Sequence, residues 1–261
     1  MENINFKGIP TSLFLNGPNL EIVSDSQTGI SIGSVTKNSS TPSVSTPVAF
    51  DDSQSAYISA TYDTNANRVV IAYQDDDNSD YGTVVVGIVT TGGFGIGTGI
   101  TFGTPIVFET ANTYWFSAVY DSFNQKVVIA YGETTPTGSY EGKARVGTVD
   151  PSNNSISFGS AVVFANTNIA YTSTTYDSTN NKVVIAWRDQ DGFDLRGKAI
   201  VGTVSGTSIS FGSEIEFNST DSHYTRITYD PTNQKVVIGY QNTHQVNSIQ
   251  VYYPTAIVGT V

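Results

Sequence analysis

The sequence predicts an all-β fold made of repeated antiparallel units, and three observations support this. First, a phrase that begins Tyr-Asp recurs at Tyr62, Tyr120, Tyr176 and Tyr229, so that its copies lie 58, 56 and 53 residues apart. Second, an apolar Val-Val-Ile run follows in each copy. Third, only 13% of the residues are charged, and the chain is rich in Thr, Ser, Asn, Gly and Tyr. A period near fifty residues is typical of a β-propeller.

Each repeat contains four segments with strand character. The first ends in the Tyr-Asp phrase, and the second is the Val-Val-Ile run, whose continuous apolar character indicates burial on both faces. The third ends in Val-Gly-x-Val, and the fourth reads Ile-x-Phe-Gly and continues to a second Phe. In the first three repeats the segments are 57–62, 69–72, 86–89 and 100–108, then 115–120, 127–130, 146–149 and 156–164, then 171–176, 183–186, 201–204 and 209–217. The last repeat has 224–229, 236–239 and 258–261 and lacks the fourth segment. Four antiparallel strands per unit form a propeller blade.

We interpret residues 1–261 as a single propeller domain, in which 43–261 carry four clear repeats and 1–42 diverge. Three short strands at 12–15, 20–23 and 29–35, with 43–50 as a fourth, would form a fifth blade. Residues 2–8 would then pair with 255–261 and close the ring, which removes a free sheet edge. The alternative is a four-bladed propeller, with 43–50 as its closing strand and an N-terminal attachment segment before it.

The repeat resembles a known family. The stretches Tyr176–Val204 and Ile209–Phe217, which include YDSTNNKVVIAW and GTSISFGS, are similar to the propeller repeats of tail-fibre and other virion proteins of marine bacteriophages. The resemblance covers 43–261 well and the lead-in at 11–36 less closely. It implies a component of the virion, assembled in the host cytoplasm, that contacts the host surface and other virion proteins. It supplies no site residues.

Composition excludes several classes of function. The net charge of −11 argues against binding nucleic acid or an anionic membrane. No apolar run approaches the ~18 residues that a spanning helix needs, so we expect no membrane insertion. The chain has no Cys and only two His, which excludes a thiolate metal site and a multi-histidine metal site.

The recurring aspartates have two interpretations. Asp63, Asp121, Asp177 and Asp230 could form a ring of metal ligands, but each lies between the same two predicted strands, which favours turns in which Asp accepts backbone N–H groups. A weaker calcium candidate is the acidic run that contains Asp75, Asp77 and Asp80, although it lacks the Gly and Glu of an EF-hand loop. Otherwise we predict no cofactor.

One end of the sheets is the predicted ligand-binding face. The turn after the first strand is uniform in all repeats, whereas the loop after the second strand differs in each, and aromatic residues and carboxylates gather there. Aromatic rings cover the C–H faces of sugars, and polar side chains bond their hydroxyls, so we predict a glycan ligand. The alternative is that these loops vary without a function. The candidate residues are Tyr81, Tyr140, Trp187, Arg188, Phe193, Arg196, Tyr252 and Tyr253.

The first strands should line the central channel of the propeller. Their members Ser59, Ser117, Ser173 and Arg226 include no carboxylate, whereas glycoside hydrolysis requires a pair of acids. We therefore predict a non-enzymatic, virion-associated binding module for a host-surface glycan or receptor. The alternatives are a purely structural virion protein, such as a capsid decoration or tail adaptor, and a polysaccharide-degrading enzyme.

Overall fold

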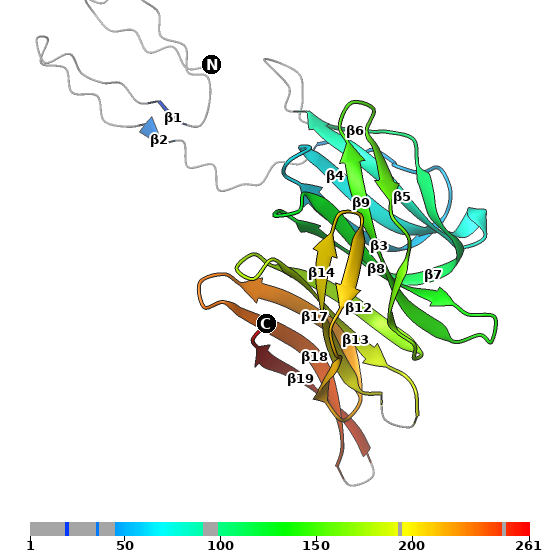
Figure 1. Cartoon of the computed structure of the whole chain (residues 1–261), viewed down its shortest axis with the longest axis vertical. Helices are drawn as coiled ribbons and strands as arrows, with labels where there is room; N and C mark the ends of the chain where they lie inside the picture. The colour runs from blue at the N-terminus through cyan, green and yellow to red at the C-terminus, as the bar shows by residue number, and fades with distance from the viewer. Residues whose placement is uncertain (1–18, 21–34, 37–44, 91–98, 193–194, 247–248) are drawn as a thin grey trace, which may run out of the picture. The chain divides into compact units, whose positions relative to one another are not determined.

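The structure is a computed structural model that describes residues 19–20, 35–36, 45–90, 99–192, 195–246 and 249–261 (Figure 1). The chain divides into two compact units, Met1–Ser45 and Thr46–Val261. In the first unit, β1 (Asn19–Leu20) pairs with β2 (Val35–Thr36) in antiparallel fashion. The other strands expected before residue 44, and the pairing of 2–8 with 255–261, concern residues outside the described part. No helix in the described part is long and apolar enough to span a membrane.

The second unit consists of antiparallel sheets, and its first two repeats share one nine-stranded sheet. They are continuous because β7 begins beside β5, with Val107 opposite Thr83, and ends beside β8, with Tyr120 opposite Val127. This strand therefore serves as the fourth strand of one repeat and the first strand of the next. The strands are β3 (Ser55–Asp63), β4 (Arg68–Asp75), β5 (Tyr81–Thr90), β6 (Gly99–Phe102), β7 (Ile106–Asp121), β8 (Lys126–Thr134), β9 (Tyr140–Asp150), β10 (Ser155–Phe158) and β11 (Val162–Ala165), with a short 3-10 turn η1 (Asp76–Asn78) after β4.

The third and fourth repeats form separate sheets. In the third, β14 pairs with β13 on one edge and with both β15 and β16 on the other. In the fourth, β19 pairs with β18, and no described strand pairs with its other edge. The strands are β12 (Ile169–Asp177), β13 (Lys182–Asp189), β14 (Gly197–Ser205), β15 (Ser208–Phe211), β16 (Ile215–Asn218), β17 (Ser222–Asp230), β18 (Lys235–Val246) and β19 (Ile249–Gly259).

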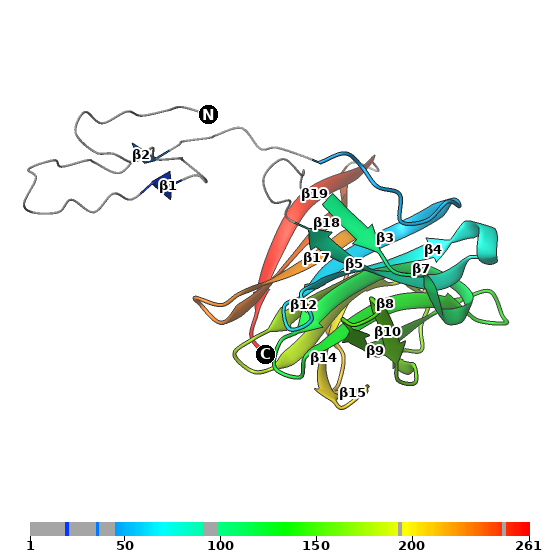
Figure 2. The same ribbon diagram turned by 90° about the horizontal axis from the view of Figure 1, so that it is seen from above.

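The four first strands, β3, β7, β12 and β17, lie side by side in chain order, and the sheets stack through them (Figure 2). This stacking covers both faces of the middle sheets, so the Val-Val-Ile runs of β8 and β13 are buried as their apolar sequence predicts. Val128, Ile185 and Trp187 belong to one core cluster between neighbouring sheets.

A phenylalanine at the end of each fourth segment packs against the next repeat. Phe108 meets Tyr131 with ring centroids 5.4 Å apart, and Phe164 meets Trp187 at 5.2 Å. Phe50 makes the equivalent contact with Tyr73 at 5.1 Å. However, residues 45–50 do not form a strand, so the prediction that they provide one is wrong for this stretch. Among the described residues, no strand pairs with residues 45–50 through backbone hydrogen bonds. Their likeness to the other repeats is therefore limited to the packing of Phe50.

The recurring aspartates form turns, as the sequence predicts. Asp177 Oδ1 accepts the N–H groups of Thr179 at 2.9 Å and Asn180 at 3.0 Å, and Asn180 Nδ2 donates to Asp177 Oδ2 at 2.8 Å. The residue with left-handed backbone is not this Asn but the next residue, Asn181, at φ 54°. The same pattern of bonds to Asp Oδ1 recurs at Asp63, Asp121 and Asp230.

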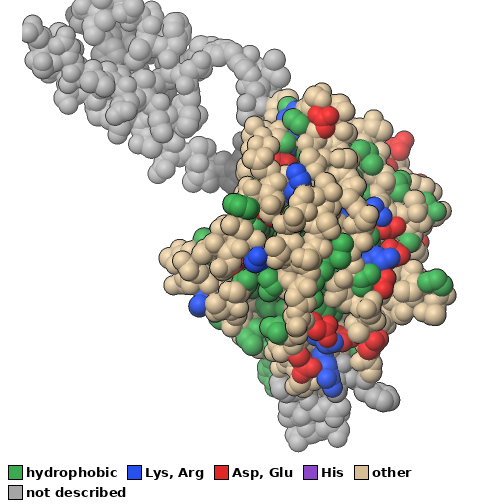
Figure 3. Space-filling view, in the orientation of Figure 1, with side chains coloured by type: hydrophobic (Ala, Val, Ile, Leu, Met, Phe, Trp, Pro, Cys, Tyr) green, Lys and Arg blue, Asp and Glu red, His purple; other side chains and the backbone are tan. Residues whose placement is uncertain are grey.

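Acidic and basic side chains adjoin one another in small groups on the face drawn in Figure 3. Lys143 pairs with Glu133 at 2.7 Å, Arg145 with Glu109 at 3.0 Å, and Lys198 with Asp189 at 2.6 Å. With Arg196, which pairs with Glu216, these are the described cations that form ion pairs.

Candidate functional site

A pocket of about 260 Å³ lies where the four first strands meet. The lining contains three consecutive residues from each of β3, β7 and β12 and one residue from β17. Ser59, Ser117, Ser173 and Arg226 are among them, which confirms that these positions face a shared space. The full lining is Tyr57, Ile58, Ser59, Trp115, Phe116, Ser117, Tyr171, Thr172, Ser173 and Arg226.

The aromatic residues of the lining have an unusual backbone conformation. Tyr57, Trp115 and Tyr171 have φ angles of 50°, 53° and 53°, and Tyr224, at the same place in β17, has 52°. Each lies where the register between the first and second strands shifts, for example between Tyr114 and Ser117. Left-handed backbone in a bulky residue costs on the order of 1–3 kcal/mol. The same strained bulge therefore recurs in four repeats and turns an aromatic ring out of the strand's normal alternation.

The rings gather in two clusters at this end of the sheets. In the first cluster, Tyr140 stands edge-on to Tyr114 and Trp115 at 5.0 and 4.9 Å, and Tyr57 stands edge-on to Tyr114 at 5.4 Å. The second cluster consists of Tyr171, His223, Tyr224 and Tyr252; Tyr171 lies 5.0 Å from Tyr224, and Tyr252 is edge-on to His223 at 6.0 Å. The pocket has lining rings from both clusters, because Tyr57 and Trp115 belong to the first and Tyr171 to the second.

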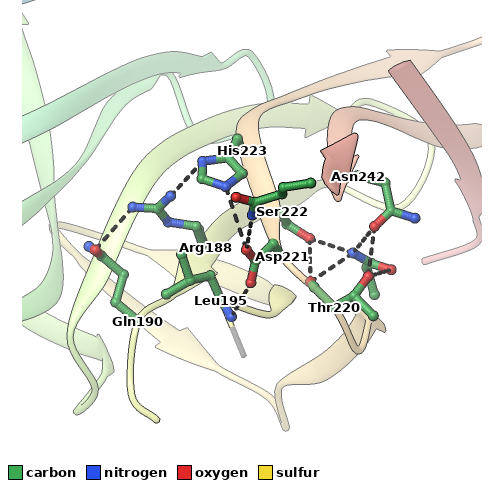
Figure 4. Close-up of polar contacts among 10 residues, drawn as sticks. Arg188, Gln190, Leu195, Thr220, Asp221, Ser222, His223 and Asn242 are labelled. Carbon is green, nitrogen blue, oxygen red and sulfur yellow. Dashed lines mark hydrogen bonds and ion pairs between the residues drawn. The ribbon is translucent and has the colours of Figure 1, made fainter. Parts of the chain in front are cut away.

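Arg188 packs against the second cluster through its guanidinium group. Its guanidinium carbon lies 4.5 Å from the centre of the Tyr171 ring, Nη1 is 2.8 Å from His223 Nδ1, and Nη2 donates to Gln190 Oε1 at 3.0 Å (Figure 4). Since a guanidinium only donates, His223 Nδ1 accepts, and the proton of the neutral imidazole is on Nε2. Nε2 is buried without a hydrogen bond to any described residue and lies 4.0 Å from Asp221 Oδ2.

The electrostatics keep His223 neutral. Burial lowers the pKa of His223 below 6.5, the charge of Arg188 lowers it further, and Asp221 opposes them. Burial also lowers the pKa of Arg188, whose side chain is 8% exposed. The second cluster thus contains an uncharged His223 and packs against the charged guanidinium of Arg188.

The structure brings three of the eight predicted ligand residues together with these clusters: Tyr140, Arg188 and Tyr252. Tyr81 and Tyr253 lie on β5 and β19 outside the ring contacts described above, and Arg196 pairs with Glu216 at 3.0 Å. Phe193 lies outside the described residues. Trp187 has no exposed surface, so a ligand cannot stack on it, and we leave it out of the site. It occupies the same repeat position as the buried Tyr73, Tyr131 and Tyr240, which identifies it as a core residue.

The calcium candidates bond to neighbouring side chains. Asp75 Oδ1 accepts from Ser53 Oγ at 3.1 Å, and Asp80 Oδ2 accepts from Asn112 Nδ2 at 2.9 Å. Among the residues that the structure describes, no group of three His, Cys, Asp or Glu side chains is arranged to hold a metal ion.

The sequence interpretation missed the strained rings. The signal that could have found them is an aromatic residue five positions before the Tyr of each Tyr-Asp phrase, namely Tyr57, Trp115, Tyr171 and Tyr224. Comparison of the chain with protein-family models and with curated proteins finds no match.

Proposed function

We propose that this chain is a five-bladed β-propeller that serves as a non-enzymatic binding module on a bacteriophage particle and recognises a host-surface glycan. The four-stranded antiparallel repeats and their contact through the first strands support the propeller. The virion and host-surface parts rest on the resemblance of the repeat to marine bacteriophage proteins.

Exposed apolar residues on the outer sheets support a fifth blade. Ile58 of β3 is 56% exposed, whereas Phe116 at the same position in β7 is 7% exposed. Val258 of β19 is 62% exposed, whereas the equivalent Val86 and Val146 are 1% and 0% exposed. Apolar positions that are covered inside the array are thus open at both of its ends, as expected if a further sheet covers them. We assign that blade to residues 1–42.

The observation that carries the binding function is the pocket with its strained rings. Four left-handed aromatic residues at equivalent positions are costly to maintain, and strain of this kind clusters at binding sites. Rings that flank a pocket containing hydroxyl groups suit a sugar, which offers C–H faces and hydroxyls.

The described residues that line the pocket include no Asp or Glu, which favours a binding function over glycoside hydrolysis. Retaining and inverting glycosidases both place two carboxyl groups about 5–10 Å apart around the bond that breaks. The lining residues can instead form hydrogen bonds and ring-stacking contacts with a ligand.

A glycan array with the purified chain tests the proposal. Tyr140→Ala and Tyr252→Ala should weaken binding several-fold, because stacked rings typically contribute ~0.5–1.5 kcal/mol beyond area burial. Asn124→Ala and Asn180→Ala, in turns at the opposite end of the sheets, should leave it unchanged. Equal loss in both pairs of variants would contradict the assigned face. If the folded chain bound no glycan and did not compete with virions for host cells, the structural virion protein would replace this proposal.

A further inference from the structure

The pocket described above has an unusual balance of donors and acceptors. The described residues that line it include no carboxylate, although the chain carries 23 acidic residues and a net charge of −11. Among these lining residues, Arg226 is the only charged one. This cation occupies the repeat position that holds Ser59, Ser117 and Ser173 in the other first strands.

Arg226 differs from the ion-paired cations of this chain. Its Nη1 donates to the carbonyl oxygen of Thr225 at 2.7 Å, and it forms no ion pair with any described residue. A guanidinium has five N–H groups in a fork that matches a carboxylate or sulfate group, so most of its donors remain available. Arg226 is exposed and, like Lys126, Lys182 and Lys235, has no acidic partner among the described residues. Its distinction is its place in the pocket lining, where its N–H groups can bind an anionic ligand.

The serine hydroxyls add further donors. Ser59 Oγ accepts the N–H of Ala118 at 2.9 Å, and Ser173 Oγ accepts the N–H of Ile227 at 3.2 Å. A hydroxyl that uses its oxygen as an acceptor in this way retains its own O–H, and neither O–H has an acceptor among the described residues. The pocket therefore presents donors from several sides.

Thr172 is one of five described threonines whose buried hydroxyl has no hydrogen-bond partner, and of these five it alone lines the pocket. Its side chain is 5% exposed and lines the pocket, and Oγ1 has no hydrogen bond within the described part of the chain. Buried hydroxyls without a partner are uncommon in folded proteins, since the loss costs roughly 1–3 kcal/mol. A ligand with an oxygen at this point would satisfy it.

From these contacts we infer that the pocket binds one anionic sugar residue, a pyranose with a carboxylate or sulfate group, with the anion on Arg226 and the ring against Trp115 and its neighbours. The volume of about 260 Å³ lies just below the ~300–1,000 Å³ of drug-sized sites, which fits a single ring better than a longer chain. This inference rests on the proposed glycan-binding function and adds the charge of the ligand and the residue that selects it.

The test uses the full chain, with sodium glucuronate and N-acetylglucosamine 6-sulfate as anionic probes, and glucose, acetate and sulfate as controls. Binding is measured by calorimetry and by tryptophan fluorescence, to which Trp115 in the pocket responds while Trp187 stays buried. At least one anionic sugar should bind saturably and more tightly than glucose or the free anions. Arg226→Gln should weaken it at least about tenfold, and added salt should weaken it too. Lys235→Gln, which removes the same charge at the other end of the β17–β18 pair, should not.

The outcomes separate the two proposals. If glucose binds as tightly as the anionic sugars, or Arg226→Gln binds them as well as the unchanged chain does, the anionic selection is wrong and the glycan module stands. Binding by calorimetry without a fluorescence change would place the ligand elsewhere and overturn the inference as well. If a folded chain, checked by circular dichroism, binds neither charged nor neutral sugars, both proposals fail. Acetate or sulfate binding as tightly as the sugars would exclude a contribution from the rings and overturn the inference of a sugar ligand.

Discussion

Ser117 Oγ accepts a hydrogen bond from the backbone N–H of Thr174 at 2.9 Å and so links β7 to β12. The same bond joins Ser59 to Ala118 and Ser173 to Ile227. The segments of the first strands that carry these serines pair with a strand on one side only, so the N–H groups on their other side need acceptors. A serine at a fixed repeat position in the first three repeats supplies an acceptor to the repeat that follows.

Ser117→Ala should lower the free energy of unfolding by about 1–2 kcal/mol, because it removes a hydrogen bond and leaves the partly buried N–H of Thr174 without an acceptor. Ser157→Ala is the matched control, since Ser157 is exposed on β10 and its side chain bonds no described residue. Urea denaturation measures both. A loss for Ser117→Ala no larger than that of the control would show that the link does not stabilise the sheet contact.

Tyr224→Gly should be more stable than Tyr224→Ala by about 1 kcal/mol. Both changes remove the ring, which is 59% exposed, but only Gly adopts φ 52° without steric cost. In an ordinary strand the order reverses, because Gly there is less stable than Ala. Thermal or urea unfolding of the two variants decides between the two orders, and greater stability of the Ala variant would exclude the left-handed bulge.

Stability should fall as the pH drops below about 6.5, and His223 is the cause. Burial and Arg188 lower its pKa in the folded state, so below 6.5 the unfolded chain binds a proton that the folded chain does not. The loss of stability begins near pH 6.5, the pKa of His223 in the unfolded chain, and grows until the pH reaches the lower pKa of His223 in the folded chain. Above pH 6.5, His223 contributes no pH dependence. Urea midpoints between pH 7.5 and 5 should decline in the unchanged protein and decline less in His223→Gln. Parallel curves for the two proteins would refute the assignment.

Asp177→Ala should destabilise the fold by ~0.5–2 kcal/mol, as does the loss of a side-chain acceptor that caps backbone N–H groups. Asn180→Ala, which removes only the Nδ2 bond to the same carboxylate, should cost less. Both should leave glycan-array binding intact, because the turn lies at the opposite end from the pocket. Loss of binding with unchanged stability would mean that the recurring Asp has a functional role.

The repeats could be predicted from the sequence because each strand type has its own pattern. The Val-Val-Ile runs became the second strands β4, β8, β13 and β18, and the Ile-x-Phe-Gly segments became β6, β10 and β15. Residues 45–50 could not be predicted in this way. Phe50 preserves the packing of its counterparts, but a strand also needs a partner for its hydrogen bonds, and the sequence of the segment itself does not report that.

The ring clusters lie at the end of the sheets where the sequence predicts a ligand-binding face, a function that stays a prediction, and only some of their residues were among the candidates. Variable loops led to Tyr140 and Tyr252, which join the ring clusters. Trp187 was misread because its aromatic character was weighed without its repeat position, which is buried in every sheet. The positive φ of Tyr57 or Tyr171 has no signature in residue type, since aromatic residues in a strand ordinarily alternate between faces.

The link from Ser117 to Thr174 has a direction, because the serine of each of the first three repeats accepts a backbone N–H of the repeat that follows. Repeats therefore join head to tail, as monomers do in a linear polymer. Duplication of one of the first three repeats, each of 53–58 residues, in the gene would rejoin a serine acceptor to a backbone donor. A shorter insertion would break that match, so recombination can change the length of this array only in whole repeats.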